Sequence, residues 1–119
     1  PNRMIDSMAA YQRATSTTAI YPGAGDTSSY EGLSYATLGL AGEVGEIANK
    51  VKKIARDQGG VITHERQHEL IDELGDVYWY LSQLATQLGT TLNVVSARNL
   101  VKLADRRGRN KLQGSGDQR

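Results

Sequence analysis

The sequence Glu43-Val44-Gly45-Glu46, matched further along the chain by Glu73-Leu74-Gly75-Asp76, decides the fold. Each pair of acids has i,i+3 spacing within an apolar pattern of helical period, so both carboxylates of a pair lie on one helical face. Gln58-Gly59-Gly60 predicts a break between the two helices, and Thr63 is a suitable N-cap for the second. With a rise of about 1.5 Å per residue, antiparallel helices joined there would bring all the carboxylates to one height.

Carboxylates that face one another repel strongly, and a divalent cation is the usual physical remedy. We therefore expect a metal site made by Glu43, Glu46, Glu73 and Asp76. Ligands that are all oxygen atoms favour Mg²⁺ or Mn²⁺. A ferritin-like di-iron site would need a Glu-x-x-His motif on two helices, and neither Glu46 nor Asp76 has a histidine at the required position.

The composition predicts a single small domain in residues 1–108, followed by a basic C-terminal tail in residues 109–119. The chain of 119 residues has no cysteine, which excludes a disulfide framework, a thiolate zinc site and a thiol nucleophile. No apolar run approaches the roughly 20 residues of a membrane span, and the start of the chain does not resemble a signal peptide. We therefore expect a cytoplasmic protein with no membrane partner.

Charge is distributed unevenly although the net charge is only +1. Nine acids and five bases lie between Glu31 and Asp76, whereas seven bases and two acids lie between Arg98 and Arg119. An acidic centre beside a basic segment suits a polyanion that binds with metal ions. The alternative is a non-catalytic helical module that uses its basic tail to bind nucleic acid or a protein partner.

Hydrophobic periodicity predicts four helices and no strand, an all-α fold resembling a four-helix bundle. The predicted helices span 4–14, 31–57, 64–88 and 92–107, with Gly89 and Gly108 as stop signals. Apolar stripes are expected to point inward on the second and third helices. These stripes consist of Leu38, Ala41, Val44, Ile47, Ala48, Val51, Ile54 and Ala55, and of Leu70, Leu74, Val77, Leu81, Leu84 and Leu88.

Four glycines lie in the interiors of the two long helices: Gly39, Gly42, Gly45 and Gly75. Each costs about 1 kcal/mol relative to alanine. We interpret that cost as a sign of close backbone approach around the acids, with packing of neighbouring helices against small residues as the alternative.

His64-Glu65-Arg66-Gln67-His68 matches H-E-x-x-H, the zinc-protease helix. Three features argue against that site. The motif lies at the predicted first turn of a helix, its neighbours are polar, and few downstream residues remain to supply a third ligand. We interpret the histidines as exposed residues near a helix start.

The two acidic motifs and their surroundings resemble the MazG-like nucleoside triphosphate pyrophosphohydrolases of the all-α NTP pyrophosphatase superfamily. The resemblance rests on residues 39–50 and 73–80, which match the family's E-x-x-E and E-x-x-D motifs. The ending, Asn99-Leu100-Val101-Lys102-Leu103 and then Gly114-Ser115-Gly116-Asp117-Gln118-Arg119, is similar to single-domain members found in phages and mobile elements.

This resemblance implies a hydrolase that uses Mg²⁺ or Mn²⁺ to convert an NTP or dNTP to the monophosphate and pyrophosphate. It makes Glu43, Glu46, Glu73 and Asp76 the metal ligands, with Glu46 as the candidate base and Glu43 beside it. Candidate phosphate contacts follow on two helices: Lys50, Lys53, Asn99, Lys102 and Arg106. Tyr80 matches an aromatic position near the nucleoside, and Tyr11 and Gln12 are weaker candidates for the base pocket. Trp79 is interpreted as a core residue, with a stacking role as the alternative.

Family members assemble as dimers or tetramers with the site between subunits, so we expect a homodimer or homotetramer here. The dUTP-directed relatives carry an extra glutamate directly after the second acid of the first pair, where this chain has Ile47. The resemblance therefore does not imply strict specificity for dUTP.

Overall fold

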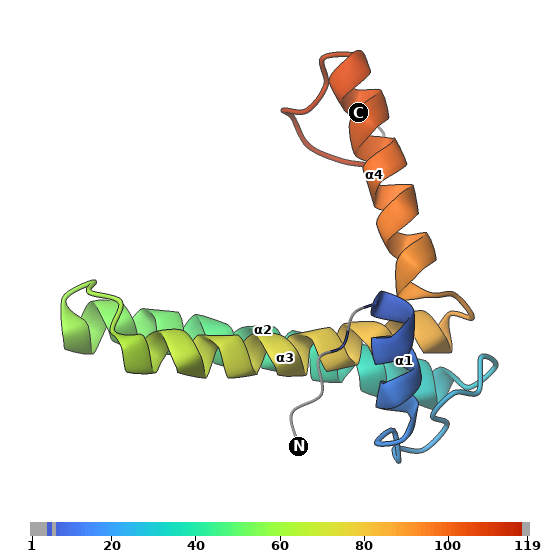
Figure 1. The fold of residues 1–119 in the computed structure, drawn as a ribbon, viewed down its shortest axis with the longest axis horizontal. Coiled ribbons are helices and arrows are strands. Elements are labelled where there is room, and N and C mark those ends of the chain that lie inside the picture. The colour runs from blue at the N-terminus through green and yellow to red at the C-terminus, as the bar shows by residue number, and fades with distance from the viewer. Residues whose placement is uncertain (1–4, 6, 118–119) are drawn as a thin grey trace.

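A computed structural model describes residue 5 and residues 7–117. The described chain contains α1 (Met8–Ser16), α2 (Tyr30–Gln58), α3 (His64–Gln87) and α4 (Leu92–Gly108), and no strand. Figure 1 shows α2 and α3 side by side, α1 across one end of this hairpin, and α4 projecting away from it. The all-helical fold and the four helices predicted from periodicity are confirmed. None of the helices in the described ranges is both long enough and apolar enough to cross a bilayer.

The turn between α2 and α3 is formed by the residues that predicted it. Gly59 caps α2 in the left-handed conformation, at φ 60°, which glycine adopts without steric cost. The Thr63 hydroxyl accepts a hydrogen bond from the Arg66 backbone N–H at 3.1 Å and starts α3. These two caps fold the helices into an antiparallel pair.

α1 begins at Met8 rather than at the predicted Met4, because the Ser7 side chain caps it by accepting from Ala10 N at 3.1 Å. Met4 lies outside the described residues. α1 contacts α3 and α4 through Gln12. Its Nε2 donates to Thr86 Oγ1 at 3.0 Å and to Thr90 O at 3.1 Å, while its Oε1 accepts from Leu92 N at 2.9 Å.

The buried centre of the molecule is unusually polar. Gln83 is 1% exposed, and its Nε2 donates to Thr15 Oγ1 at 2.8 Å. The Tyr21 hydroxyl lies 2.9 Å from Gln83 Oε1 and 3.0 Å from Gln87 Oε1. Buried polar groups are tolerated when they are paired, and this network fixes α1 and the loop after it against α3.

The prediction that both apolar stripes point inward holds in the single chain for Ile54, which is 7% exposed, and is wrong for several other large side chains. Leu38 on α2 is 70% exposed, and Leu74 and Leu88 on α3 are 56% and 63% exposed. The buried side chains of α3 are instead Ser82, Gln83, Ala85 and Gln87. The reason is that spacing defines the faces of a helix without deciding which face meets its neighbour. Here the small side chains of Ala36, Ser82 and Ala85 are buried, together with the polar side chains of Gln83 and Gln87.

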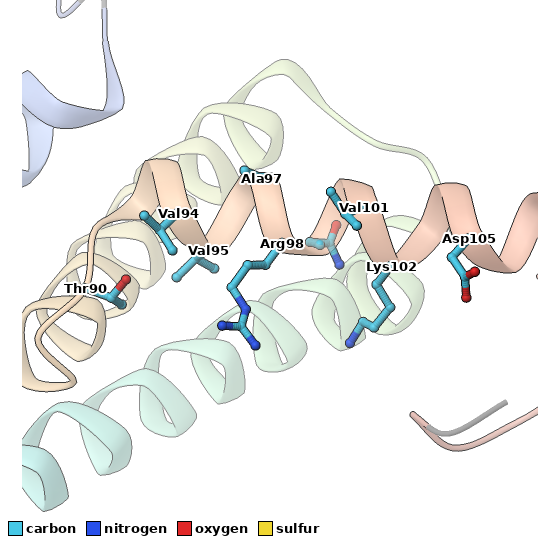
Figure 2. A pocket seen from close by; sticks show the side chains of 9 residues that line it. Thr90, Val94, Val95, Ala97, Arg98, Val101, Lys102 and Asp105 are labelled. Atoms are coloured by element: carbon cyan, nitrogen blue, oxygen red, sulfur yellow. The ribbon is translucent and has the colours of Figure 1, made fainter.

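The chain is also extended for its mass. Its accessible surface is 8598 Å², compared with about 6,300 Å² expected for a compact protein of this mass. Its radius of gyration is 17.2 Å, compared with about 13.5 Å for a compact domain of this length. One cause is α4, which packs against α1 and α3 but not against α2. An open cavity of about 980 Å³ lies along α4, and Arg98 and Lys102 point to the same side of that helix (Figure 2).

Candidate metal centre

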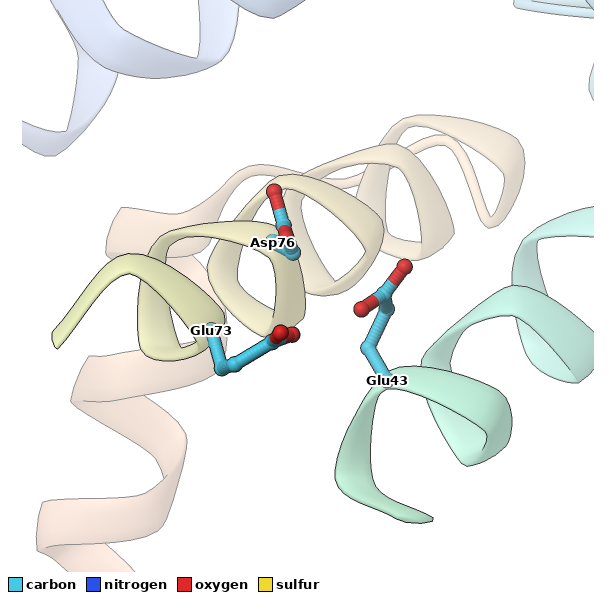
Figure 3. Close-up of side chains that lie close together, drawn as sticks. All are labelled: Glu43, Glu73 and Asp76. Carbon is cyan, nitrogen blue, oxygen red and sulfur yellow. The ribbon is translucent and has the colours of Figure 1, made fainter. Parts of the chain in front are cut away.

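Three of the predicted acids meet across the hairpin. Glu43 comes from α2, and Glu73 and Asp76 come from α3; each offers an oxygen, and these oxygens all lie within 4.8 Å of one another. Figure 3 shows Glu43 on α2 facing Glu73 on α3, with Asp76 nearby on α3. The i,i+3 spacing places both acids of α3 on the face toward α2, and the turn at Gly59 sets Glu43 at their height. We refer to Glu43, Glu73 and Asp76 as the carboxylate trio.

The electrostatics of the trio show like charges crowded together. The pKa of Glu43 is raised by burial first, then by the charge of Asp76, by a hydrogen bond with Glu73, and by the charges of Glu73 and Glu46. Glu73 Oε2 is buried and has no hydrogen-bond partner among the described residues. A buried, unpaired carboxylate oxygen is costly unless a cation satisfies it. A donor set made only of carboxylate oxygens suits Mg²⁺ or Mn²⁺.

Glu46, the fourth predicted ligand, does not join the trio. It is exposed on α2, one turn beyond Glu43. Its charge contributes to raising the pKa of Glu43, which places it in the same electrostatic environment. Its role as a ligand or base stays a prediction.

Lys50 forms an ion pair with Glu73, one acid of the trio. Its Nζ lies 3.8 Å from Glu73 Oε1, and both side chains are largely buried. Lys53, one turn further along α2, lies near the hairpin turn. There the pKa of Asp57 is lowered first by its hydrogen bond with Arg56, and then by the charges of Arg56, Arg66 and Lys53. Lys50 is therefore beside the acids, and Lys53 lies toward the turn.

A cavity of about 320 Å³ adjoins the trio and is lined by Thr18, Glu43, Asp76, Trp79 and Tyr80. The two aromatic rings lie 5.0 Å apart at 84°. The pKa of Tyr80 is raised by burial first, then by Tyr35, and then by Glu43 and Asp76. Tyr80 therefore lies beside two acids of the trio, and its role near the nucleoside stays a prediction.

Two residues of this cavity were not among the predicted site residues. Trp79, for which a stacking role was the alternative to a core position, forms a wall of the cavity, and its Nε1 donates to Thr18 Oγ1 at 2.9 Å. Thr18 lies in the loop after α1, and no motif marks it. For Trp79, the one signal in the sequence that it borders the site is that it directly precedes Tyr80.

The glycines behave differently from one another. A Cβ at Gly39 would collide with the ring of Tyr80, so this glycine permits the close approach that was expected near the acids. Gly42, Gly45 and Gly75 have open space at the Cβ position. The expected crowding is therefore found at Gly39 and not at the other three positions within this chain.

The remaining candidates lie away from the trio or are already paired. Tyr11 stacks on Tyr78 with ring centroids 4.7 Å apart, and its pKa is raised by burial first, then by Tyr78 and by the charge of Asp76, which places it near the trio. Gln12 lines a different cavity. Asn99 and Lys102 line the cavity along α4 (Figure 2), and Arg106 is buried on the same helix. A single chain thus separates the basic residues of α4 from the carboxylate trio.

The H-E-x-x-H histidines are exposed at the start of α3, as expected. Their Nε2 atoms lie 3.0 Å apart. Within the described ranges, the carboxylate trio is the one grouping of three or more His, Asp or Glu ligand atoms. No third ligand atom of these residue types groups with the two histidines in the part of the chain that the structure describes.

Comparison with known proteins gives the same family as the motifs. The chain is 63% identical over 109 residues to the Gene 37 protein of Mycobacterium phage L5, an alignment that covers 92% of this chain and 96% of that protein. No solved structure matches the chain significantly. Residues 32–109, which contain all the predicted acids, match the MazG nucleotide pyrophosphohydrolase domain. The chain therefore belongs to the MazG nucleotide pyrophosphohydrolase domain family.

Proposed function

We propose that this protein is a metal-dependent pyrophosphohydrolase that converts an NTP or dNTP to the nucleoside monophosphate and pyrophosphate. The observation that carries the proposal is the carboxylate trio beside a cavity with aromatic walls, within a MazG domain. Acids hold metal ions, and aromatic rings stack on nucleobases. The two features together suit a nucleotide that carries a metal-bound polyphosphate.

Glu43, Glu73 and Asp76 would hold Mg²⁺ or Mn²⁺, with Glu46 as the fourth ligand. A metal held there would supply positive charge to offset the triphosphate and to make a water easier to deprotonate. Glu46 is the proposed acceptor of the proton that the attacking water loses, because its exposed carboxylate is free of the trio. The water oxygen bonds to the α-phosphorus while the bond from that phosphorus to the α–β bridging oxygen breaks, which releases pyrophosphate.

The other proposed contacts divide between phosphate and nucleoside. Lys50 and Lys53 follow Glu46 along α2, and Asn99 and Lys102 supply a second polar set on α4. Tyr80 and Trp79 border the trio on the side where a nucleoside would lie.

We further propose that the active form is a homodimer or homotetramer. The apolar stripes of α2 and α3 and the exposed Leu100 and Val101 of α4 leave more apolar surface than a monomer usually shows. Association would cover these faces. It would also bring the basic residues of one chain's α4 near the trio of another chain, since within one chain α4 and the trio are separated.

A panel of the common NTPs and dNTPs, each incubated with Mg²⁺ or Mn²⁺, tests the proposal. We expect equimolar pyrophosphate and monophosphate, and no product with EDTA. Inert nucleotides together with salt-sensitive DNA binding would instead support the nucleic-acid-binding module. Asp72→Asn is a matched control for substitutions in the trio, because Asp72 is an exposed acid of α3 outside it. His64→Ala and His68→Ala should also retain activity.

A further inference from the structure

The segment after α4 folds back onto that helix. The Lys111 backbone N–H donates to Arg106 O at 2.6 Å, and Asn110 adopts φ 57°. Gly114 and Gly116 adopt φ 115° and 84°, values that glycine tolerates far better than other residues. Figure 1 shows the resulting loop returning alongside α4. The turns bring Asp117 beside Lys102 and Arg106, which precede it by 15 and 11 residues.

Arg106 anchors this returning segment. Its side chain is only 6% exposed, and its Nη2 donates to Asp117 O at 3.0 Å and approaches Asp117 Oδ1 at 3.4 Å. Its Nε is buried without a hydrogen-bond partner in the described part of the chain. A buried guanidinium needs an opposite charge, and Asp117 supplies it. Arg106 is thus committed to the segment after α4 instead of facing the cavity.

Lys102 lies one turn before Arg106 and shares the same carboxylate. Its Nζ is 3.3 Å from Asp117 Oδ1, and 44% of its side chain is exposed. The pKa of Asp117 is lowered by Lys102 first and by Arg106 second, so its carboxylate is charged. An ammonium carries three donors, and one contact to Asp117 leaves two for another anion. Lys102 also lines the cavity along α4 (Figure 2).

We propose that Asp117 is a positioning residue that holds the Lys102 ammonium toward the polyphosphate, and that the buried Arg106 guanidinium fixes Asp117 in place. The inference rests on the proposed function for the identity of the anion, and on the proposed oligomer, which brings the α4 helix of one chain near the carboxylate trio of another. A free lysine side chain has many rotamers, and holding it in one geometry before binding reduces the entropy that the substrate must otherwise remove. Asp117 acts through Lys102 and does not touch the substrate.

A competing role for Asp117, as a stand-in for a phosphate, predicts the opposite effect on substrate binding. If the Asp117 carboxylate occupied the position of a phosphate, it would compete with the substrate, and removing its charge would tighten binding. Positioning predicts that removing the charge weakens binding. The two roles are therefore separated by the sign of one change.

The test compares Asp117→Asn, Asp117→Glu, Lys102→Met and the double variant Asp117→Asn/Lys102→Met in the full chain. Asp57→Asn is the matched control, because Asp57 is also paired with an arginine but lies at the end of α2. Steady-state kinetics with the preferred nucleotide give KM and kcat, and calorimetry measures the binding of tripolyphosphate without turnover. Circular dichroism checks that each variant is folded.

Asp117→Asn should raise KM and weaken tripolyphosphate binding by about tenfold, the effect of one charge-assisted contact, and leave kcat within about twofold. Asp117→Glu should restore part of the loss, and the double variant should be no worse than Lys102→Met.

Unchanged or tighter binding in Asp117→Asn, or losses that add fully in the double variant, would overturn the proposal. If the wild type hydrolyses no nucleotide, the proposed function fails, and tripolyphosphate binding alone decides this inference. A wild type that does not bind tripolyphosphate overturns it.

Discussion

Lys50 Nζ lies 3.8 Å from Glu73 Oε1 and joins α2 to α3 beside the carboxylate trio. This pair places one positive charge where three acids converge. Because the Lys50 and Glu73 side chains are 26% and 18% exposed, the pair is shielded from solvent more than a surface salt bridge. Lys50 can therefore act both on the acids and on a phosphate oxygen that binds near them.

Lys50→Met should raise KM for the nucleotide about tenfold, because a charged contact to phosphate is lost. Lys52→Met is the control, since Lys52 is exposed on the same helix and has no role in the proposed site. Steady-state kinetics of both variants check this. Equal KM values for the two variants would remove Lys50 from the phosphate site.

The raised pKa of Glu43 predicts how the stability of the metal-free protein changes with pH. Burial and the neighbouring acids raise this pKa above its ordinary value of 4.5, so the folded state holds the proton more tightly than the unfolded chain. The contribution of Glu43 to stability is therefore full below pH 4.5 and is lost as the pH rises through the raised value.

Urea unfolding with EDTA across this range should show Glu43→Gln more stable than the wild type at neutral pH. The two proteins should converge under acidic conditions, where Glu43 is neutral in both. A stability difference that does not vary with pH would contradict the assignment.

Gly39 and Gly42 provide a matched pair of substitutions on α2. Gly39→Ala should destabilise the fold by about 1–3 kcal/mol, because the new Cβ collides with Tyr80. Gly42→Ala meets open space within the chain and should stabilise α2 by up to about 1 kcal/mol. Thermal unfolding of both variants measures the difference. Equal stability of the two variants would show that the Tyr80 ring does not need Gly39.

The exposed apolar faces predict an oligomer. Sedimentation equilibrium at micromolar concentration should give the mass of a dimer or tetramer, in a closed arrangement. Leu100→Glu should shift the protein toward monomer, because a charge then lies in a face that the partner would cover. Gln67→Glu, an exposed polar position on α3, is the control. A wild-type monomer with full activity would defeat this prediction.

Local signals account for most of what could be predicted from the sequence. Gly59 and Thr63 mark the hairpin turn because their backbone and side-chain preferences act over a few residues. The spacing of Glu73 and Asp76 places them on one face, and the turn then aligns them with Glu43. The carboxylate trio is thus a consequence of helical period and loop position.

Relationships that depend on tertiary packing could not be predicted in the same way. Thr18 reaches the cavity because the loop after α1 lies against Trp79, and no local pattern encodes that contact. The outward direction of Leu38 and Leu74 follows from which faces of α2 and α3 meet, a choice that period alone leaves open. The polar network around Gln83 filled the interior in place of the apolar stripe that was expected there.

The most direct test of the central claim measures pyrophosphate release and Mn²⁺ binding on the same preparations of wild type, Asp76→Asn and Asp72→Asn. The account predicts that the wild type and Asp72→Asn bind Mn²⁺ and release pyrophosphate from a nucleoside triphosphate. It predicts that Asp76→Asn loses at least about a hundredfold in rate and binds Mn²⁺ more weakly, while its metal-free form is at least as stable as the wild type. Near-normal turnover and Mn²⁺ binding in Asp76→Asn would contradict the carboxylate trio as the catalytic metal centre.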